Sequence, residues 1–295
     1  MRCTTQSLAP RQMEQTAQLE TLIDGLSFPE APRWHDGKLW FSDFYSLRVL
    51  AVDLRGNATT VVEVPERPSG LGWRPDGTLL IVSMRDRCLY RLDAHQLVRV
   101  ADLSAMTSGL CNDMVVDAQG RAYVGNFGYD RHAGEAPRTT CIVRVDLDGR
   151  AVRAAEDLLF PNGTVITPDG KTLIVAETFA HRLTAFDVAA DGALGNRRVF
   201  AHIEGLYPDG ICLDQQGAIW VADPWGKRVV RVLDGGRIER TISTGARGAY
   251  ACMLGGDDRL TLLVCTNTGS GPAMAEKRDG RIEFVRVDIP GAGLP

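Results

Sequence analysis

The stretch FPNGTVITPDGKTLIVAET, residues 160–178, carries two candidate turns in close succession. Pro161-Asn162-Gly163 and Pro168-Asp169-Gly170 both have turn composition, because Gly and Asn tolerate positive φ and Pro presets the backbone. Only residues 164–167 separate them. If both were hairpin turns, the strand between them would be very short, so one of the two is expected to serve another purpose.

The same pattern recurs six times along the chain. Each copy has a leading segment, a strand, a turn that often contains Asp-Gly, a second apolar strand, a loop and a third strand. The six copies occupy residues 28–53, 67–93, 110–149, 160–187, 207–233 and 248–288. The turn glycines Gly37, Gly77, Gly120, Gly170 and Gly217 are spaced by 40, 43, 50 and 47 residues, and Asp258 follows after 41. A period of about 40–50 residues with several short strands per unit is typical of a β-propeller.

The repeat therefore predicts an all-β, six-bladed propeller with four-stranded antiparallel blades. The sixth copy lacks chain for its outer strand, and the segment LETLIDG, residues 19–25, can supply it. We expect the ring to close by pairing of the N- and C-terminal strands, which removes exposed sheet edges. Residues 19–295 form one domain in this interpretation, and residues 1–18 form a polar extension with a helical pattern over residues 6–18.

Composition excludes several classes of partner. The chain has 295 residues, a net charge of −4 and no basic block, so neither nucleic acid nor a membrane surface is expected to bind. It shows no apolar run of about 18 residues and no secretory signal. Seven scattered cysteines without a CxxC pair favour free thiols in a reducing cytoplasm. The oligomeric state is left open.

A set of oxygen-bearing residues stands at one position of the repeat. Counting back eight residues from each turn, or seven in the shorter first copy, reaches Glu30, Ser69, Asn112, Asn162, Asp209 and, less securely, Tyr250. Equivalent positions of a propeller lie around its axis, so these side chains should meet at one end of the central channel. An all-oxygen ring with two carboxylates suits a hard divalent cation such as Ca²⁺ or Mg²⁺, and Mn²⁺ or Zn²⁺ could also bind.

A purely structural interpretation of these residues was weighed against the metal site. Asn-Gly and Asp-Gly are ordinary turn dipeptides and need no ligand. Glu30, however, lies between a Pro and the start of an apolar strand, where a carboxylate has no turn role. Three oxygen ligands in one register favour a metal site. Pro168-Asp169-Gly170 is then the hairpin turn, and Asn162 is a candidate ligand.

Four of these segments resemble a known family. The segments FPEAPRW, NDMVVDAQGRAYVGN, FPNGTVITPDGKTLIVAET and YPDGICLDQQGAIWVA are similar to the senescence marker protein/gluconolactonase/luciferin-regenerating enzyme family, which includes regucalcin and bacterial sugar lactonases. The resemblance implies a six-bladed propeller, one divalent metal in the channel and hydrolysis of a lactone ring. It also implies that Glu30, Asn162 and Asp209 are metal ligands and that Asn112 contacts substrate or a metal-bound water.

One position departs from the family pattern. Sugar lactonases of the family commonly place an Arg that binds sugar hydroxyls two residues before the Asn, and this chain has Leu110 there. A lactone or ester less polar than a sugar lactone is therefore the expected substrate.

The expected reaction is metal-dependent opening of a lactone ring. The cation, Ca²⁺, Zn²⁺, Mn²⁺, Mg²⁺ or Fe²⁺, would polarise the carbonyl, Asp209 would activate water, and Asn112 would hold the water or the carbonyl. Loops after the second strand of each blade should supply the walls of the substrate pocket. The candidates are Leu110, Phe44, Tyr45, Met84, Arg85, Phe127, Tyr129, Phe179 and Trp225. The insertion at residues 128–140 could cover the opening or be a surface loop.

Other functions were considered. The alternatives are a non-catalytic propeller that binds Ca²⁺ or another ligand, and a hydrolase of other esters or phosphotriesters on the same scaffold. The chain has no G-x-S-x-G or H-E-x-x-H motif and no Walker loop. A serine hydrolase, a histidine-based zinc protease and a nucleotide-binding enzyme are therefore not supported.

Overall fold

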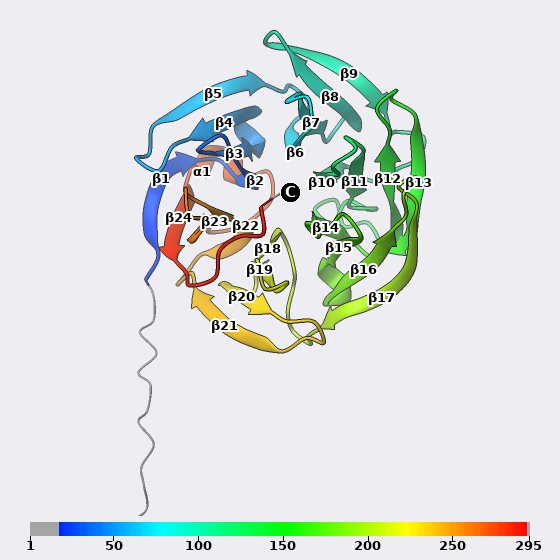
Figure 1. Cartoon of the computed structure of the whole chain (residues 1–295). Coiled ribbons are helices and arrows are strands. Elements are labelled where there is room, and N and C mark those ends of the chain that lie inside the picture. The colour runs from blue at the N-terminus through cyan, green and yellow to red at the C-terminus, as the bar shows by residue number, and fades with distance from the viewer. Residues whose placement is uncertain (1–17, 294–295) are drawn as a thin grey trace, which may run out of the picture.

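The computed structural model describes residues 18–293, and it forms a ring of six four-stranded antiparallel sheets (Figure 1). The predicted six-bladed propeller is confirmed. Residues 1–17 of the predicted N-terminal extension lie outside the described range. None of the helices in residues 18–293 is long and apolar enough to cross a membrane.

The first three blades run outward from the central channel in chain order. The first blade contains β2 (Pro29–His35), β3 (Lys38–Asp43), β4 (Arg48–Val52) and β5 (Ala58–Glu63). The second contains β6 (Pro68–Trp73), β7 (Leu79–Ser83), β8 (Cys88–Asp93) and β9 (Gln96–Asp102). The third contains β10 (Cys111–Val116), β11 (Ala122–Asn126), β12 (Thr140–Val145) and β13 (Ala151–Leu158).

The other three blades follow the same plan. The fourth contains β14 (Pro161–Ile166), β15 (Thr172–Glu177), β16 (Arg182–Val188) and β17 (Leu194–His202), and the fifth contains β18 (Ile211–Leu213), β19 (Ile219–Asp223), β20 (Arg228–Val232) and β21 (Ile238–Ser243). The sixth contains β22 (Gly248–Gly255), β23 (Thr261–Asn267), β24 (Gly280–Arg286) and, outermost, β1 (Glu20–Leu26). Short helices follow three of the second strands: η1 (Phe44–Ser46), η2 (Thr178–Ala180) and α1 (Met274–Lys277).

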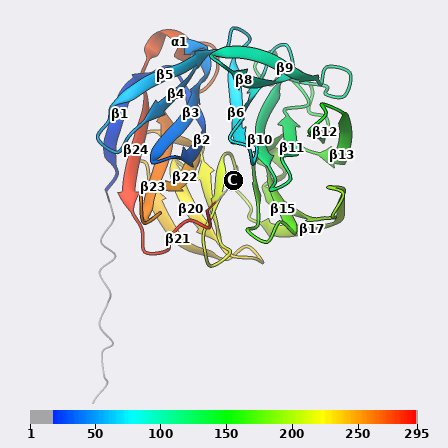
Figure 2. The same ribbon diagram turned by 45° about the horizontal axis from the view of Figure 1, so that its top comes forward.

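The ring closes as the sequence predicts. β1 pairs antiparallel with β24, with Glu20 opposite Phe284 and Leu26 opposite Gly280. In both views the first strand, in blue, lies beside the last, in red (Figures 1 and 2). The sixth blade is thus built from both ends of the described chain, and β1 covers the edge that β24 would otherwise expose.

Apolar contacts between the faces of neighbouring blades form the core. One cluster joins the sixth blade to the first and fifth, and others join the second blade to the third, the third to the fourth and the fourth to the fifth. The turn glycines at 37, 77, 120, 170 and 217 all have positive φ, so they form the hairpins that the sequence predicts. The six cysteines in the described range are all buried and free.

A buried polar residue ends the second strand of every blade, a feature that the sequence interpretation did not use. Several of these side chains hold the segment that leads into the blade: Asp43 accepts the amides of Ser27 and Phe28 at 2.9 and 2.8 Å, and Glu177 accepts the amide of Leu159 at 2.8 Å. The full set is Asp43, Ser83, Asn126, Glu177, Asp223 and Asn267. They help to fix the backbone from which the channel residues project.

Gly163 allows two innermost strands to approach closely. A Cβ atom added at this glycine would lie 2.5 Å from the backbone nitrogen of Ile211 in the next blade. The backbone amide of Gly163 also donates to the carbonyl of Asp209 at 3.1 Å. Gly70 and Gly210 have equally short gaps to their neighbouring blades, at 2.5 and 2.4 Å.

We therefore expect Gly163→Ala to destabilise the protein by about 1–3 kcal/mol, the usual result of overpacking. The measurement is the free energy of unfolding in urea. Gly195→Ala is the matched control, because Gly195 lies in β17 with ordinary φ and no atom within 4 Å of an added Cβ. That change should be neutral or stabilising, and equal losses in the two variants would contradict the close-approach argument.

Candidate active site at one end of the channel

The predicted ring residues lie on or just before the innermost strands. Asn162 is the second residue of β14, and the pairing register shifts between Pro161 and Thr164. Similar shifts occur beside Glu30, Ser69, Asn112 and Tyr250 in their own strands. A register shift of this kind places an extra residue in one strand, which redirects a side chain, and such bulges are common beside active sites. These shifts account for how the ring residues come to face the channel.

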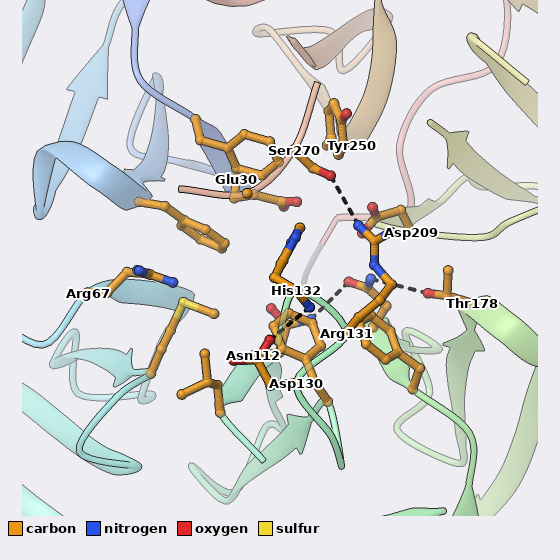
Figure 3. A pocket seen from close by; sticks show the side chains of 18 of the residues that line it. Glu30, Arg67, Asn112, Asp130, Arg131, His132, Thr178, Asp209, Tyr250 and Ser270 are labelled. Carbon is orange, nitrogen blue, oxygen red and sulfur yellow. Dashed lines mark hydrogen bonds between the residues drawn. The ribbon is translucent and has the colours of Figure 1, made fainter. Parts of the chain in front are cut away.

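The polar members of the ring contact one another. Asn112 Nδ2 donates to Asn162 Oδ1 at 3.0 Å, and Ser69 Oγ donates to Asn112 Oδ1 at 3.2 Å. Asn162 Nδ2 donates to Thr178 Oγ1 at 3.3 Å. Asn112, Asn162 and Asp209 are all buried. All three line the pocket and form its polar floor. Figure 3 shows Asn112 and Asp209 there.

The two carboxylates of the ring, Glu30 and Asp209, both have raised pKa values. Burial raises the pKa of Glu30 well above its usual value, and the negative charge of Asp209 raises it further. Burial likewise raises the pKa of Asp209, while a hydrogen bond from Asn162 opposes that effect. A divalent cation would offset both charges, and carboxylate and carboxamide oxygens are suitable ligands for it.

Glu30, Asn162 and Asp209 therefore fit a hard cation in the chemistry of their donor atoms. Charged ligands are few at this site. Within residues 18–293, no three His, Cys, Asp or Glu side chains are grouped so that they could hold a metal ion. The carboxamide of Asn162 would have to provide the third protein ligand, with the open channel providing room for water or substrate.

A buried ion pair lies next to the ring. Arg33 Nη2 is 2.7 Å from Asp113 Oδ1 and donates to the carbonyl of Met114 at 2.7 Å, so it ties the first blade to the third across the channel. Both side chains are almost completely buried. Burial raises the pKa of Asp113, and Arg33 opposes the rise.

Every predicted wall residue except Arg85 lines one pocket above this floor. The pocket has a volume of about 810 Å³, part of it open to solvent. The predicted residues that line it are Glu30, Asn112, Asn162, Asp209, Leu110, Phe44, Tyr45, Met84, Phe127, Tyr129, Phe179 and Trp225. Arg85 is exposed and is not among the lining residues. Ser69 also lies outside the lining and acts only through its hydrogen bond to Asn112.

Aromatic rings form two walls of the pocket. On one side Phe160 stacks on Phe127 at 4.5 Å between centroids and meets Phe179 edge-on at 4.8 Å. On the other side Phe28 packs edge-on against Tyr250 at 4.7 Å. A pocket with apolar walls and a few convergent polar groups is typical of a small-molecule site.

The insertion at residues 128–140 lies over the mouth of the pocket. Tyr129, Asp130, Arg131 and His132 line the pocket. Arg131 Nη2 donates to Ser270 Oγ of the sixth blade at 3.2 Å. The guanidinium of Arg131 also lies 5.4 Å from the ring centroid of Trp225 in the fifth blade. Through Arg131 the insertion connects the third blade with the opposite rim (Figure 3).

Several lining residues were not predicted from the sequence. They are Phe28, Arg67, Asp130, Arg131, His132, Phe160, Thr178, Ser270 and Gly271, with Tyr250 predicted only as a ring member. A signal for three of them was present: Phe28, Arg67 and Phe160 stand two residues before Glu30, Ser69 and Asn162, the same relation that Leu110 has to Asn112. Ser270 and Gly271 lie at the site only because of the tertiary fold, and no local sequence pattern predicts their position there.

Comparison with known proteins gives consistent results. The family described as "SMP-30/Gluconolactonase/LRE-like region" matches residues 28–268. A 6-deoxy-6-sulfogluconolactonase of Pseudomonas putida is 30% identical over 280 residues, which cover 90% of this chain and 93% of that protein. The structure of a gluconolactonase of Xanthomonas campestris superposes with a TM-score of 0.72 at 26% identity, covering 93% of this chain and 90% of that one. The structure of a calcium-binding regucalcin of Agrobacterium tumefaciens has a TM-score of 0.79 at 22% identity, with coverage of 95% and 97%.

Proposed function

Because the chain belongs to the SMP-30/gluconolactonase/LRE-like family, we propose that it is a divalent-metal-dependent hydrolase that opens a lactone ring. The observation that carries this proposal is the convergence of Glu30, Asn112, Asn162 and Asp209 on the floor of one aromatic pocket. Two of the similar proteins are named for gluconolactone-type substrates, and one is described as calcium-binding.

In this proposal Glu30, Asn162 and Asp209 hold the cation. A divalent ion bound there supplies polarisation of the lactone carbonyl and a lowered pKa for water. Asp209 accepts a proton from the attacking water. The water oxygen bonds to the carbonyl carbon, the ring C–O bond breaks, and the proton held by Asp209 passes to the departing ring oxygen, so that the product is the hydroxy acid. Asn112, beside Asn162, orients the water or the carbonyl.

The walls favour a substrate with an apolar body. Leu110 lines the pocket together with Phe127, Phe160 and Phe179, and these side chains offer no hydrogen bonds to sugar hydroxyls. We propose a lactone or related ester whose body is less polar than that of a sugar lactone. A pH-drop assay over aldono-, alkyl- and aromatic lactones tests this choice, and a preference for aldonolactones would contradict it.

Removal of the metal should abolish hydrolysis. We expect chelated protein to lose turnover and to unfold at lower temperature, because a ligand at about 100 times its Kd stabilises the folded state by about 2.7 kcal/mol. Adding Ca²⁺, Zn²⁺, Mn²⁺, Mg²⁺ and Fe²⁺ in turn should restore both properties with at least one ion. Full lactone turnover by protein in which metal analysis finds no ion would refute metal dependence. Bound metal without turnover of any lactone would favour a non-catalytic binding protein.

A further inference from the structure

One repeat position carries an arginine in a single blade. The residue two before each ring position is Phe28, Arg67, Leu110, Phe160 or Tyr207 in the first five blades. Four of these five are apolar or aromatic, and only the second blade has a charge. Phe28, Leu110 and Phe160 line the pocket, and so does Arg67, which enters it from the side opposite Arg131 (Figure 3).

The backbone and side chain of Arg67 are both held in place. The amide of Arg67 donates to the carbonyl of Val64 at 3.0 Å, and its carbonyl accepts the amide of Met84 at 2.8 Å. Its φ is 74°, in the left-handed region that favours glycine. The guanidinium carbon lies 4.8 Å from the ring centroid of Tyr45, a cation–π contact that fixes the direction of the side chain. The charge is thus preorganised at the pocket wall.

This charge has no acidic partner. Within residues 18–293 Arg67 forms no ion pair and no side-chain hydrogen bond, and its Nε is buried without a partner. Burial lowers the pKa of Arg67, as expected for a cation that has lost water without gaining an anion.

The neighbouring charges do not compensate for this loss. Arg85, which also faces Tyr45, has the same sign. The acid whose charge acts on Arg67 is Asp130, whose Oδ1 already accepts the amides of His132 and Ala133 at 2.9 and 3.0 Å. Arg131, the other arginine of the pocket, differs from Arg67 because it is engaged by Ser270 and Trp225. The guanidinium of Arg67 is therefore the cationic group of the pocket that could pair with a bound anion.

We propose that Arg67 is a specificity-determining residue that binds an anionic group carried by the lactone substrate. This inference rests on the proposed lactone hydrolysis at the same site. The lactone carbonyl would lie at Asn112 and Asp209, and the body of the substrate would lie between the aromatic walls. A sulfonate, carboxylate or phosphate of the substrate would lie at the guanidinium of Arg67, because a guanidinium can bind such groups with two parallel hydrogen bonds. The substrate class is then a lactone with an apolar body and one acidic group.

The test compares matched pairs of substrates. One pair is a δ-lactone with a sulfonatomethyl group and the same lactone with a neutral methylsulfonyl group, and the second pair has a carboxylate and its carboxamide. Metal-loaded wild type is expected to prefer the anionic member in kcat/KM. Arg67→Met should reduce that preference about 10- to 100-fold, mainly through KM, the usual effect of losing a hydrogen bond to a charged group. Arg67→Lys, which keeps the charge, should recover part of it.

Arg85→Met is the control for net charge, because Arg85 lies at the same end of the molecule without lining the pocket. It should change the preference less than about threefold, as a screened surface charge does. Equal kcat/KM for both members of each pair in the wild type would overturn the inference while leaving the proposed lactonase intact. A preference that survives Arg67→Met but is lost in Arg131→Met would also overturn it.

Failure of the proposed function is distinguishable from failure of this inference. If no lactone is hydrolysed, the same sulfonate and sulfone compounds are titrated calorimetrically against wild type and Arg67→Met. Tighter binding of the sulfonate that disappears in Arg67→Met supports the anion site without any turnover. Equal affinity of the wild type for the two compounds refutes it.

Discussion

Asp209→Asn is expected to lower kcat for lactone hydrolysis by about 10³-fold, even at saturating metal. The change keeps the size of the side chain but removes the carboxylate that accepts a proton from water, and general-base catalysis typically contributes about 10²- to 10⁴-fold. The measurement is kcat by pH-stat titration, with a lactone that the wild type hydrolyses, over a range of metal concentrations.

Glu30→Gln separates the role of the base from that of a ligand. Glu30 shares the buried floor with Asp209 and is proposed as a ligand only. Both variants should bind metal more weakly, but Glu30→Gln should regain most of its kcat when metal is saturating. A value for Asp209→Asn within tenfold of the Glu30→Gln value under those conditions would show that Asp209 is not the base.

Loss of folding does not explain the expected defect of Asp209→Asn. Burial raises the pKa of Asp209, so its ionised form is costly in the folded protein without metal, and the neutral isostere removes that cost. Chelated Asp209→Asn should therefore melt at a temperature no lower than that of chelated wild type. A much lower melting temperature would mean that the carboxylate has a structural partner in the metal-free protein.

The fold could be predicted because each blade carries its own local information. The second apolar strand and the 40–50-residue spacing recur in every copy, and five of the six copies carry the turn glycine. The need to close the ring assigned the segment before the first copy to the sixth blade. Residues 1–18 contain no copy of the repeat, so only their amino-acid composition supports the predicted helical pattern.

Part of the site could be predicted because residues at the same position of each repeat lie at equivalent places around the axis of the propeller. Asn162 in the first of two apparent turns and Asp209 one blade later stand at the same repeat position, and both reach the pocket floor. Gly163 beside Asn162 has a packing role that depends on Ile211 in the next blade. Such contacts between blades, like that of Arg131 with Ser270, join residues more than 40 positions apart, and no local pattern reveals them.

Arg33→Met is expected to destabilise the protein by about 3–5 kcal/mol, because it leaves the buried carboxylate of Asp113 without its partner. The same guanidinium also donates to the carbonyls of Pro32 and Met114, so the innermost strands of the first and third blades lose a shared anchor. The free energy of unfolding in guanidinium chloride measures the loss. The double variant Arg33→Met/Asp113→Asn should recover much of it, because the unpaired charge is then absent.

The pH dependence of Arg33→Met gives an independent test of the same ion pair. Burial already raises the pKa of Asp113 in the wild type, and Arg33 is the main opposing charge, so removing Arg33 should raise that pKa further. A carboxyl whose pKa is higher in the folded than in the unfolded state binds its proton more tightly when folded. It stabilises the protein at low pH, and this contribution is lost as the pH rises through the folded value. The deficit of Arg33→Met relative to wild type should therefore shrink as the pH falls. A deficit that does not change with pH would mean that lost packing, rather than the unpaired charge of Asp113, causes it.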